Sequence, residues 1–436
     1  MPLLTEARIE SIEMPENLAV SMMVMQQRME CQRNGCDFEI VHYAFGGSPF
    51  PVPEAVQARL RESTDQGHYG PAEGMEPLRE QIASFWASHF DLEVDASRIV
   101  VTPGSKWAIY LILAMLKGPV LLPAPSWVGY LPIAQLLGKE IVTVPTQAAE
   151  GYRLTPAGLA ATVSGIAAPQ KLLVLNSPNN PTGIVYSRSD LEELAAVCRE
   201  HGIIVISDEI YSLITFGGAP FVSMASVYPE GTFVTNAISK HCGAGGYRLG
   251  FTILPTDCPD EQLMNFRKVG AATYTNAPAP IQSASIAAFE GGSEVEAYIE
   301  AQRNIHRIMT TELYRRFITL PGVTATEPQG SFYFFADFNS LRDRINAAGL
   351  ETSRDVAASL LAHPHHIATV SGASLLMPPD SLTFRIAAVD YDGAAALADY
   401  QADQPTTPDA EAAFAERHAA PMMGGVETLR SWINSL

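Results

Sequence analysis

Short apolar strands alternate with amphipathic helices through the middle of the chain, and this alternation most limits how the chain can fold. Apolar runs and helical stretches follow one another at residues 99–102, 106–116, 119–122, 172–178, 189–202 and 203–211. Strands that are apolar on both faces are typical of parallel sheets covered by helices on each side. The sequence therefore predicts an α/β fold with a mostly parallel sheet.

The length and the C-terminal half indicate two lobes. A chain of 436 residues exceeds what one compact core usually holds. A long helical region starts near Ser293, and strand-like segments follow at 331–338 and 381–389, which is typical of a smaller α+β domain. Beyond residue 401 we expect a Pro- and Ala-rich connector and a last short helix from Val426. We expect a large domain (51–290), a small domain built from two segments (1–50 with 291–401), and a C-terminal extension (402–436).

The charge balance and the cysteines limit the partners and the location. Twenty-eight Lys and Arg stand against 47 Asp and Glu, a net charge of −19, which disfavours binding to nucleic acid or to an anionic membrane. The sequence has no apolar run of about eighteen residues, so we expect no membrane span. Five cysteines without a CxxC pair fit reduced thiols, and the acidic N-terminus lacks the pattern of a secretion signal. We therefore expect a cytoplasmic protein.

Polar residues gather where the predicted strands end or turn into helices. Ligands of open parallel sheets bind beyond the carboxyl ends of the strands, so these residues are the candidates for a functional site. Four such segments are TPGSKWA, NSPNNPTG, SDEIY and AISKHCGAGGYRLG, at residues 102–108, 176–183, 207–211 and 237–250.

Four side chains in these segments complement one another chemically. The Lys240 amine can condense with an aldehyde, and the Asp208 carboxylate can keep a pyridine nitrogen protonated. Tyr211 and Asn180 can hydrogen-bond a phenolic oxygen. This set suits the aldehyde-bearing ring of pyridoxal phosphate.

The same segments also offer groups for a phosphate. Arg248 carries a guanidinium, and the Gly-Ser turn at 104–105 opens a helix whose free N–H groups attract an anion. Each feature alone has an ordinary explanation as a turn, a helix cap or a solvated charge. Together they predict a pocket for pyridoxal phosphate.

In the order NSPNNPTG, SDEIY and Ser-Lys…Gly-Tyr-Arg-Leu-Gly, these motifs resemble those of the class I aminotransferases, a family of fold-type-I pyridoxal-phosphate enzymes. The similarity extends from about Glu13 to Tyr400 and is nearest to the bacterial aspartate-aminotransferase-like branch. It implies a large domain with a mostly parallel seven-stranded sheet, a smaller α+β domain and pyridoxal 5'-phosphate as cofactor. It also implies transfer of an amino group between an amino acid and a 2-oxo acid, by a homodimer with shared active sites.

The resemblance also implies roles for individual residues. Lys240 would hold the cofactor as a Schiff base and shuttle the proton, Asp208 would pair with the pyridine nitrogen, and Tyr211 would bond the ring oxygen. The cofactor-binding positions would be Gly104, Ser105, Lys106, Trp127, Asn180, Asp208, Tyr211, Lys240, Arg248 and Tyr69. The substrate-binding positions would be Gly46, Lys106, Trp127, Asn180 and Arg385.

Three of these positions carry more specific expectations. Arg385 in LTFRIAA matches the arginine that grips the substrate α-carboxylate with two prongs. Lys106 matches a lysine that reaches the distal carboxylate of a dicarboxylic amino acid, although a lysine at a helix start can also face solvent. Tyr69 in HYGPAEG matches a tyrosine that reaches the cofactor phosphate of the neighbouring subunit, which is why the resemblance implies a dimer.

The chain departs from the family pattern near the substrate. Ala237 stands where the family often has a hydroxyl, and HCGAGG at 241–246 replaces a bulkier sequence. PENLAVS at 15–21 shows no evident hydroxyl for a distal carboxylate. These departures leave open a second hypothesis, a pyridoxal-phosphate-dependent lyase or carbon–carbon bond-forming enzyme of secondary metabolism on the same scaffold.

Two other classes of function fit less well. A catalytically silent binding module would have lost Lys240, Asp208 or Arg385, and all three are present. The histidines at 363–366 lack an Asp, Glu or Cys at ligand spacing, so we expect a loop there and no metal site.

Overall fold

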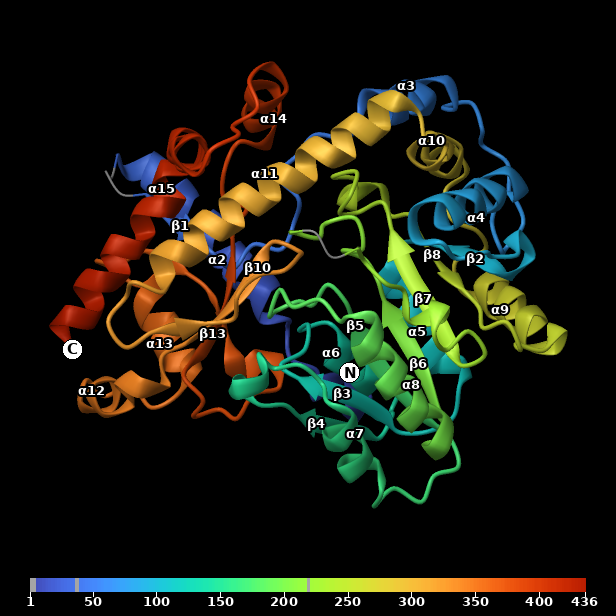
Figure 1. Cartoon of the computed structure of the whole chain (residues 1–436), viewed down its shortest axis with the longest axis horizontal. Helices are drawn as coiled ribbons and strands as arrows, with labels where there is room; N and C mark the ends of the chain where they lie inside the picture. The colour runs from blue at the N-terminus through green and yellow to red at the C-terminus, as the bar shows by residue number, and fades with distance from the viewer. Residues whose placement is uncertain (1–4, 36–38, 218–219) are drawn as a thin grey trace, which may run out of the picture.

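A seven-stranded sheet forms the centre of the larger part of the molecule (Figure 1). The structure is a computed structural model that describes residues 5–35, 39–217 and 220–436. The strands lie in the order β2 (Ile99–Thr102), β8 (Gly250–Ile253), β7 (Thr232–Ala237), β6 (Ile203–Asp208), β5 (Lys171–Asn176), β3 (Val120–Ala124) and β4 (Ile141–Pro145). All are parallel except β8, which runs antiparallel to both of its neighbours. The prediction of a mostly parallel sheet is confirmed.

Helices cover both faces of this sheet. Along β5, Leu173 and Leu175 pack into the core on one face, while Leu172 and Val174 pack into the core on the other. Every residue of β5 is buried, which explains why the strand appears in the sequence as an unbroken apolar run. The helices of this part are α3 (Glu54–Glu62), α4 (Glu76–Phe90), α5 (Ser105–Met115), α6 (Tyr130–Leu136), α7 (Pro156–Val163), α8 (Arg188–His201), α9 (Asp260–Thr273) and α10 (Ala279–Phe289).

A smaller sheet lies in the second part of the molecule. Its antiparallel strands follow the order β12 (Val370–Ser371), β13 (Thr383–Ala387), β10 (Tyr333–Asp337) and β9 (Thr324–Ala325), and a two-stranded parallel pair joins β1 (Val41–His42) to β11 (Ile367–Ala368). The accompanying helices are α1 (Ala7–Glu10), α2 (Glu16–Asn34), α11 (Ser293–Phe317), α12 (Arg342–Ala347), α13 (Ser353–Leu361) and α14 (Gly393–Ala402). The long helix α11 runs from the neighbourhood of α3 and α10 across to this second part (Figure 1).

The C-terminal tail is helical over α15 (Pro408–Ser435), as two helical stretches that meet at a kink, and it packs against α11. The expected Pro- and Ala-rich connector before Val426 is therefore wrong. The helix is kinked at Ala419, whose φ of −139° is not helical, two residues before Pro421. Proline disrupts the helical hydrogen bonds locally, so the chain bends there and continues as a helix beyond it. Side chains of α15 join the core around α11: Phe414, Met422, Met423, Val426, Leu429, Trp432 and Ile433.

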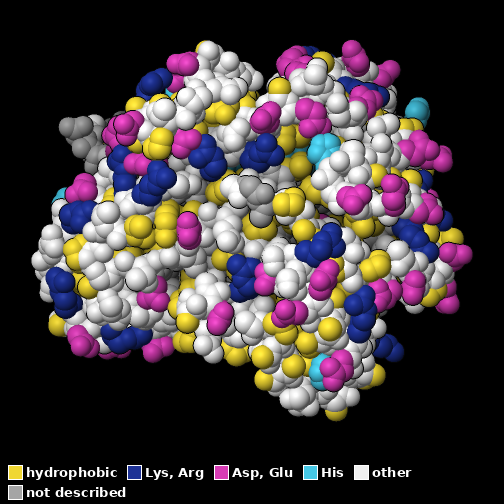
Figure 2. Space-filling view, in the orientation of Figure 1, with side chains coloured by type: hydrophobic (Ala, Val, Ile, Leu, Met, Phe, Trp, Pro, Cys, Tyr) yellow, Lys and Arg dark blue, Asp and Glu magenta, His cyan; other side chains and the backbone are white. Residues whose placement is uncertain are grey.

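Cysteine state and surface charge complete the description. Cys31 is disulfide-bonded, so the expectation of reduced thiols is wrong for this residue, whereas Cys198, Cys242 and Cys258 are free. Among the described residues, no helix is both long and apolar enough to cross a membrane. Acidic and basic side chains are interspersed on the face shown in Figure 2.

Candidate active site

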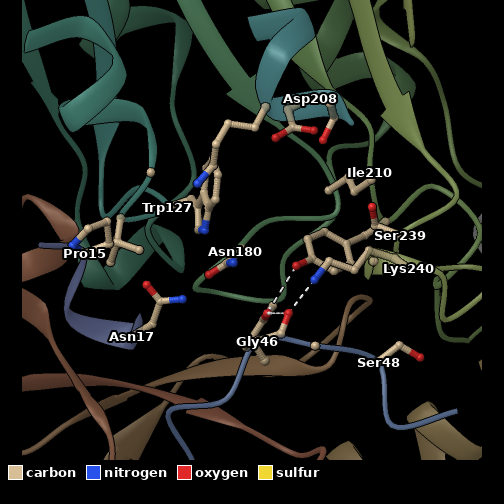
Figure 3. Close-up of a pocket in the computed structure, with 18 of the residues that line it drawn as sticks. Pro15, Asn17, Gly46, Ser48, Trp127, Asn180, Asp208, Ile210, Ser239 and Lys240 are labelled. Carbon is tan, nitrogen blue, oxygen red and sulfur yellow. Dashed lines mark hydrogen bonds between the residues drawn. The ribbon is translucent and has the colours of Figure 1, made fainter. Parts of the chain in front are cut away.

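A cavity of about 550 Å³ opens at the carboxyl ends of the central strands and is lined by both parts of the molecule. Its position follows from the parallel sheet, because side chains after β5, β6 and β7 all emerge at this edge. It brings together ten of the twelve residues predicted from the sequence: Gly46, Ser105, Lys106, Trp127, Asn180, Asp208, Tyr211, Lys240, Arg248 and Arg385. Trp127 and Lys240 lie on opposite sides of the cavity, with Asp208 at one end (Figure 3).

Lys240 follows β7 and reaches into the cavity. Its Nζ donates a hydrogen bond to the carbonyl oxygen of Gly46 and lies 5.5 Å from the ring centroid of Tyr211. Its own carbonyl oxygen accepts a 2.7 Å hydrogen bond from Nε2 of Gln302 on α11. Burial and then the charge of Arg385 lower the pKa of Lys240 to about 8. About one tenth of this amine is therefore neutral, and nucleophilic, at pH 7, far more than for an ordinary lysine.

Asp208 ends β6 inside the protein, at 4% exposure. Burial raises its pKa to about 6, although hydrogen bonds from the Tyr130 hydroxyl and the backbone of Ile210 act in the opposite direction. The Tyr130 contact to Oδ2 measures 2.6 Å. A buried carboxyl group with a raised pKa is ready to pair with a cationic partner, since that partner would stabilise its charged form.

The loop after β5 is fixed by Asn176. The Oδ1 of Asn176 accepts the backbone N–H of Asn180 at 2.7 Å, and its Nδ2 donates to the carbonyl oxygen of Asp208 at 2.7 Å. The Asn180 amide oxygen in turn accepts a hydrogen bond from Nη1 of Arg385 at 3.3 Å. This loop therefore connects the end of β6 to the arginine on β13.

The start of α5 forms a cationic corner of the site. Gly104 caps the helix with a φ of 89°, and a Cβ there would stand 2.3 Å from Nη2 of Arg248. Likewise, a Cβ on Gly250 would stand 2.4 Å from the backbone nitrogen of Ser105. Only glycine at both positions lets Arg248 lie against the free N–H groups of the helix start. Lys106 adds a third positive group, 5.1 Å from the Trp127 ring centroid, and burial lowers its pKa.

Arg385 on β13 is completely buried at another wall of the cavity. Its Nη2 donates to the carbonyl oxygen of Ala44 at 2.7 Å, and its guanidinium lies 4.7 Å from the ring centroid of Tyr333. Its Nε has no hydrogen-bond partner among the described residues. A buried guanidinium with an unused donor is suited to an anionic ligand.

Two predicted residues lie outside the cavity lining. Gly104 does not line the cavity, but its lack of a side chain leaves room for Arg248, which does. Tyr69 is 88% exposed on the surface. An exposed tyrosine of this kind does not reach the cavity of its own chain.

Sequence reasoning did not name several lining residues. Tyr130 begins α6 three residues after Trp127, which lies in the loop before the helix, and the two ring centroids are 5.0 Å apart. Asn17 and Tyr333 come from the second part of the molecule, so no local motif links them to Lys240. Asn17 lies in PENLAVS, the segment that showed no evident hydroxyl, and supplies an amide instead (Figure 3). The other lining residues missed include Pro15, Leu18, Phe45, Asn176 and Ser239.

The donor set fits one cofactor. An amine with a lowered pKa, a buried carboxylate, an indole face and a cationic helix start surround one cavity at a sheet edge. These groups match the aldehyde, the pyridine nitrogen, the ring and the phosphate of pyridoxal phosphate, and the glycines at 104 and 250 let Arg248 and the start of α5 pack closely at the phosphate corner. The fold and site are those of a pyridoxal-phosphate enzyme.

Comparison with known proteins identifies the family. Residues 34–399 match the profile of the family "Aminotransferase class I and II", to which the chain belongs. An aspartate aminotransferase of Geobacillus stearothermophilus is 29% identical over 368 residues, 83% of this chain and 90% of the relative. An aspartate/prephenate aminotransferase of Thermus thermophilus is 30% identical over 76% of this chain and 84% of the relative. A solved structure of Thermus thermophilus aspartate aminotransferase has a TM-score of 0.79 at 26% identity and covers 99% of this chain and 100% of that chain.

The chain is a pyridoxal-phosphate-dependent aminotransferase that moves an amino group between an amino acid and a 2-oxo acid. The alternative of a lyase or carbon–carbon bond-forming enzyme is not favoured, because these relatives are aminotransferases.

Proposed function

We propose that Lys240 is the lysine that binds the cofactor aldehyde and that moves the substrate α-proton. The observation that supports this assignment is the position of its Nζ, in the cavity between Gly46 and the Tyr211 ring, together with its lowered pKa. When bound, pyridoxal phosphate accepts the amino group and stabilises the electron pair left on the substrate Cα. Once displaced by substrate, the neutral Lys240 amine can take the Cα proton and return it as an ammonium.

The other cofactor contacts follow from the same arrangement. Asp208 would hold the pyridine nitrogen protonated, since a cation beside it lowers its raised pKa. Tyr211 and Asn180 would bond the ring oxygen, and Trp127 would stack on the ring. Ser105, Arg248 and the helix start at Gly104 would hold the phosphate.

We propose a dicarboxylic amino acid as the substrate. Arg385, with its unused Nε and the adjacent Asn180, would bind the α-carboxylate, and Gly46 would offer its backbone. Lys106 lines the same cavity and would bind the distal carboxylate, with Asn17 nearby as a second polar group. Only the Nδ2 of Asn17 could donate to a carboxylate, because its Oδ1 is an acceptor. The solved structure of Thermus thermophilus aspartate aminotransferase is a structure with maleate, a dicarboxylate, which supports this choice.

The test compares amino donors in the half-reaction of the Lys106→Met variant. Loss of a charged hydrogen bond of about 1.5–3 kcal/mol predicts a kcat/KM for aspartate that is lower by roughly 10- to 150-fold, whereas the value for alanine changes less than about twofold. The exposed Lys117→Met variant is the matched control and should leave both values unchanged. An equal loss for aspartate and alanine would assign Lys106 to the cofactor phosphate instead.

We propose a cytoplasmic homodimer in which Tyr69 reaches the cofactor phosphate of the neighbouring subunit. Its 88% exposure supports this role, because a large aromatic side chain on a surface loop is available to a second copy. Mixed dimers test it. Tyr69→Ala and Lys240→Ala chains, each poor in cofactor binding or turnover alone, should form hybrids with one complete site. Hybrids no more active than the parent variants would exclude shared sites.

We also propose that the chain divides into a large domain (51–290), a small domain (1–50 with 291–401) and a C-terminal extension (402–436).

A further inference from the structure

Tyr333 lies where the cofactor side of the cavity meets the substrate side. It belongs to β10, is fully buried and lines the cavity. Its hydroxyl oxygen lies 3.2 Å from the Tyr211 hydroxyl and 3.4 Å from the carbonyl oxygen of Gly46. The Arg385 guanidinium lies 4.7 Å from the centroid of its ring. One side chain therefore contacts the proposed ring-oxygen donor and the proposed carboxylate-binding arginine.

The fold enforces this position. Phe335 and Arg385 are paired across β10 and β13, so Tyr333 lies diagonally opposite Arg385 on the same face of the sheet. Gly46 leaves the space that the hydroxyl needs, because a Cβ there would stand 3.1 Å from the Tyr333 oxygen. The Tyr211 and Tyr333 rings are nearly perpendicular, with an interplanar angle of 89°. Packing from two elements thus holds the Tyr333 hydroxyl beside Tyr211.

The direction of the hydrogen bond follows from what Tyr211 must do. To bond a ring oxygen, Tyr211 uses its only proton, and its own oxygen can then accept one. The Tyr333 hydroxyl lies within reach of two acceptors, the Tyr211 oxygen at 3.2 Å and the Gly46 carbonyl oxygen at 3.4 Å, and Tyr211 is the nearer of the two. Donors arranged in a chain strengthen one another in a low-dielectric site.

We propose that Tyr333 is a positioning residue that donates to the Tyr211 hydroxyl and, through its ring, aligns Arg385 for the substrate carboxylate. This inference rests on the proposed assignments of Lys240, Tyr211 and Arg385. The hydroxyl and the ring have separate effects, so two substitutions distinguish them.

The first test is an absorbance titration of the Tyr333→Phe holoenzyme, which keeps the ring and loses the hydroxyl. A weaker Tyr211 donor makes the cofactor ring oxygen more basic, so the pH midpoint of the visible absorbance change should rise. A cooperative gain of 10–30% in one charged hydrogen bond corresponds to roughly 0.1–0.7 pH units, and about 0.3 is expected. A midpoint that is unchanged, or that falls, overturns the hydroxyl role.

Tyr391→Phe is the matched control for this titration. Tyr391 is a partly buried tyrosine, and its hydroxyl is buried with no hydrogen-bond partner among the described residues. Its midpoint should equal that of the parent enzyme. A rise as large as that of Tyr333→Phe would mean that loss of any buried hydroxyl moves the midpoint, and would overturn the inference.

The second test compares substrate saturation in Tyr333→Phe and Tyr333→Leu. The phenylalanine keeps the face under Arg385, so the half-saturating amino acid concentration should change less than about twofold. Leucine removes the cation–π contact and should raise that concentration about tenfold, at little change in kcat. Equal values for the two variants would remove the aligning role of the ring.

The Lys240→Ala variant tests the inference about Tyr333 separately from the assignment of Lys240 as the cofactor lysine, on which it rests. If that variant keeps the visible band, the assignment of the cofactor lysine fails and the role of Tyr333 fails with it. If the band is lost and the Tyr333→Phe midpoint is still unmoved, only the Tyr333 inference fails.

Discussion

The hydroxyl of Tyr130 donates a 2.6 Å hydrogen bond to Oδ2 of Asp208, and both side chains are buried. The Trp127 and Tyr130 ring centroids are 5.0 Å apart. One short segment, the loop before α6 and the first residue of that helix, therefore supplies both the ring proposed to stack on the cofactor and the donor that holds the buried acid. The two proposed cofactor contacts depend on each other through this segment.

Tyr130→Phe should weaken cofactor binding. The hydrogen bond from Tyr130 lowers the pKa of Asp208, which burial raises to about 6, so its loss moves that pKa further up. Less carboxylate is then available at neutral pH to pair with a pyridinium. A lost hydrogen bond to a charged group, about 1.5–3 kcal/mol, predicts a roughly 10- to 150-fold larger Kd for pyridoxal phosphate, measured by quenching of tryptophan fluorescence. Tyr110→Phe, outside the cavity lining, is the control, and equal Kd values for the two variants would contradict this role.

Asp208→Asn should stabilise the cofactor-free protein at neutral pH while it impairs the holoenzyme. The pKa of Asp208 is raised from 3.8 in the unfolded chain to about 6 in the folded one. The folded state therefore binds more protons between these values, and stability falls as pH rises through this interval. At pH 8 the buried charge costs at most about 3 kcal/mol, which the neutral amide avoids.

The measurement is urea unfolding of the cofactor-free parent and Asp208→Asn proteins at several pH values. Their free energies of unfolding should differ most at pH 8 and converge toward pH 4. A difference that is constant across this range would show that the Asp208 carboxyl group does not titrate in this interval. With cofactor added, the order of stability should reverse, because the amide cannot hold the pyridine nitrogen protonated.

Much of the fold was predictable because its pattern is local. The strands β2, β3, β5 and β6 are buried on both faces, and an apolar run between helical segments shows this without any tertiary information. The tail was mispredicted for the opposite reason. Pro421 and the surrounding alanines suggest a connector, but the apolar stripe of α15 meets α11, and this tertiary contact keeps the segment helical.

The candidate site, like the fold, was predictable only where its residues belong to local sequence motifs. Asn180, Asp208, Lys240 and Arg248 stand at strand ends or next to glycines, and the structure places all four on one cavity. Tyr333 escaped notice because nothing near it in sequence distinguishes it from a core aromatic residue. Its importance appears only when β10 is paired with β13 and Gly46 is seen to leave space for its hydroxyl.

Arg385→Lys should weaken all amino donors alike. Lysine keeps the charge, but it loses the planar fork that donates to Ala44 and Asn180 and stacks on Tyr333. A loss of about 2–3 kcal/mol predicts a kcat/KM lower by roughly 30- to 150-fold for aspartate and for alanine. Stopped-flow half-reactions with both donors measure this ratio. A loss confined to aspartate would instead place Arg385 at the distal carboxylate.

Trp432→Ala should destabilise the protein without changing the site. Trp432 on α15 is 3% exposed and packs in the core around α11, where its ring centroid lies 6.4 Å from that of Phe338. Truncating a buried tryptophan costs about 3–5 kcal/mol through lost burial and the cavity that remains. Asn434→Ala, on the exposed side of the same turn, should stay within about 0.5 kcal/mol of the parent. Denaturant unfolding measures both. The pH midpoint of the visible absorbance change should be the same in the folded Trp432→Ala holoenzyme and in the parent, because α15 contributes no residue to the cavity lining. A small loss of stability would show that α15 can detach without disturbing the core.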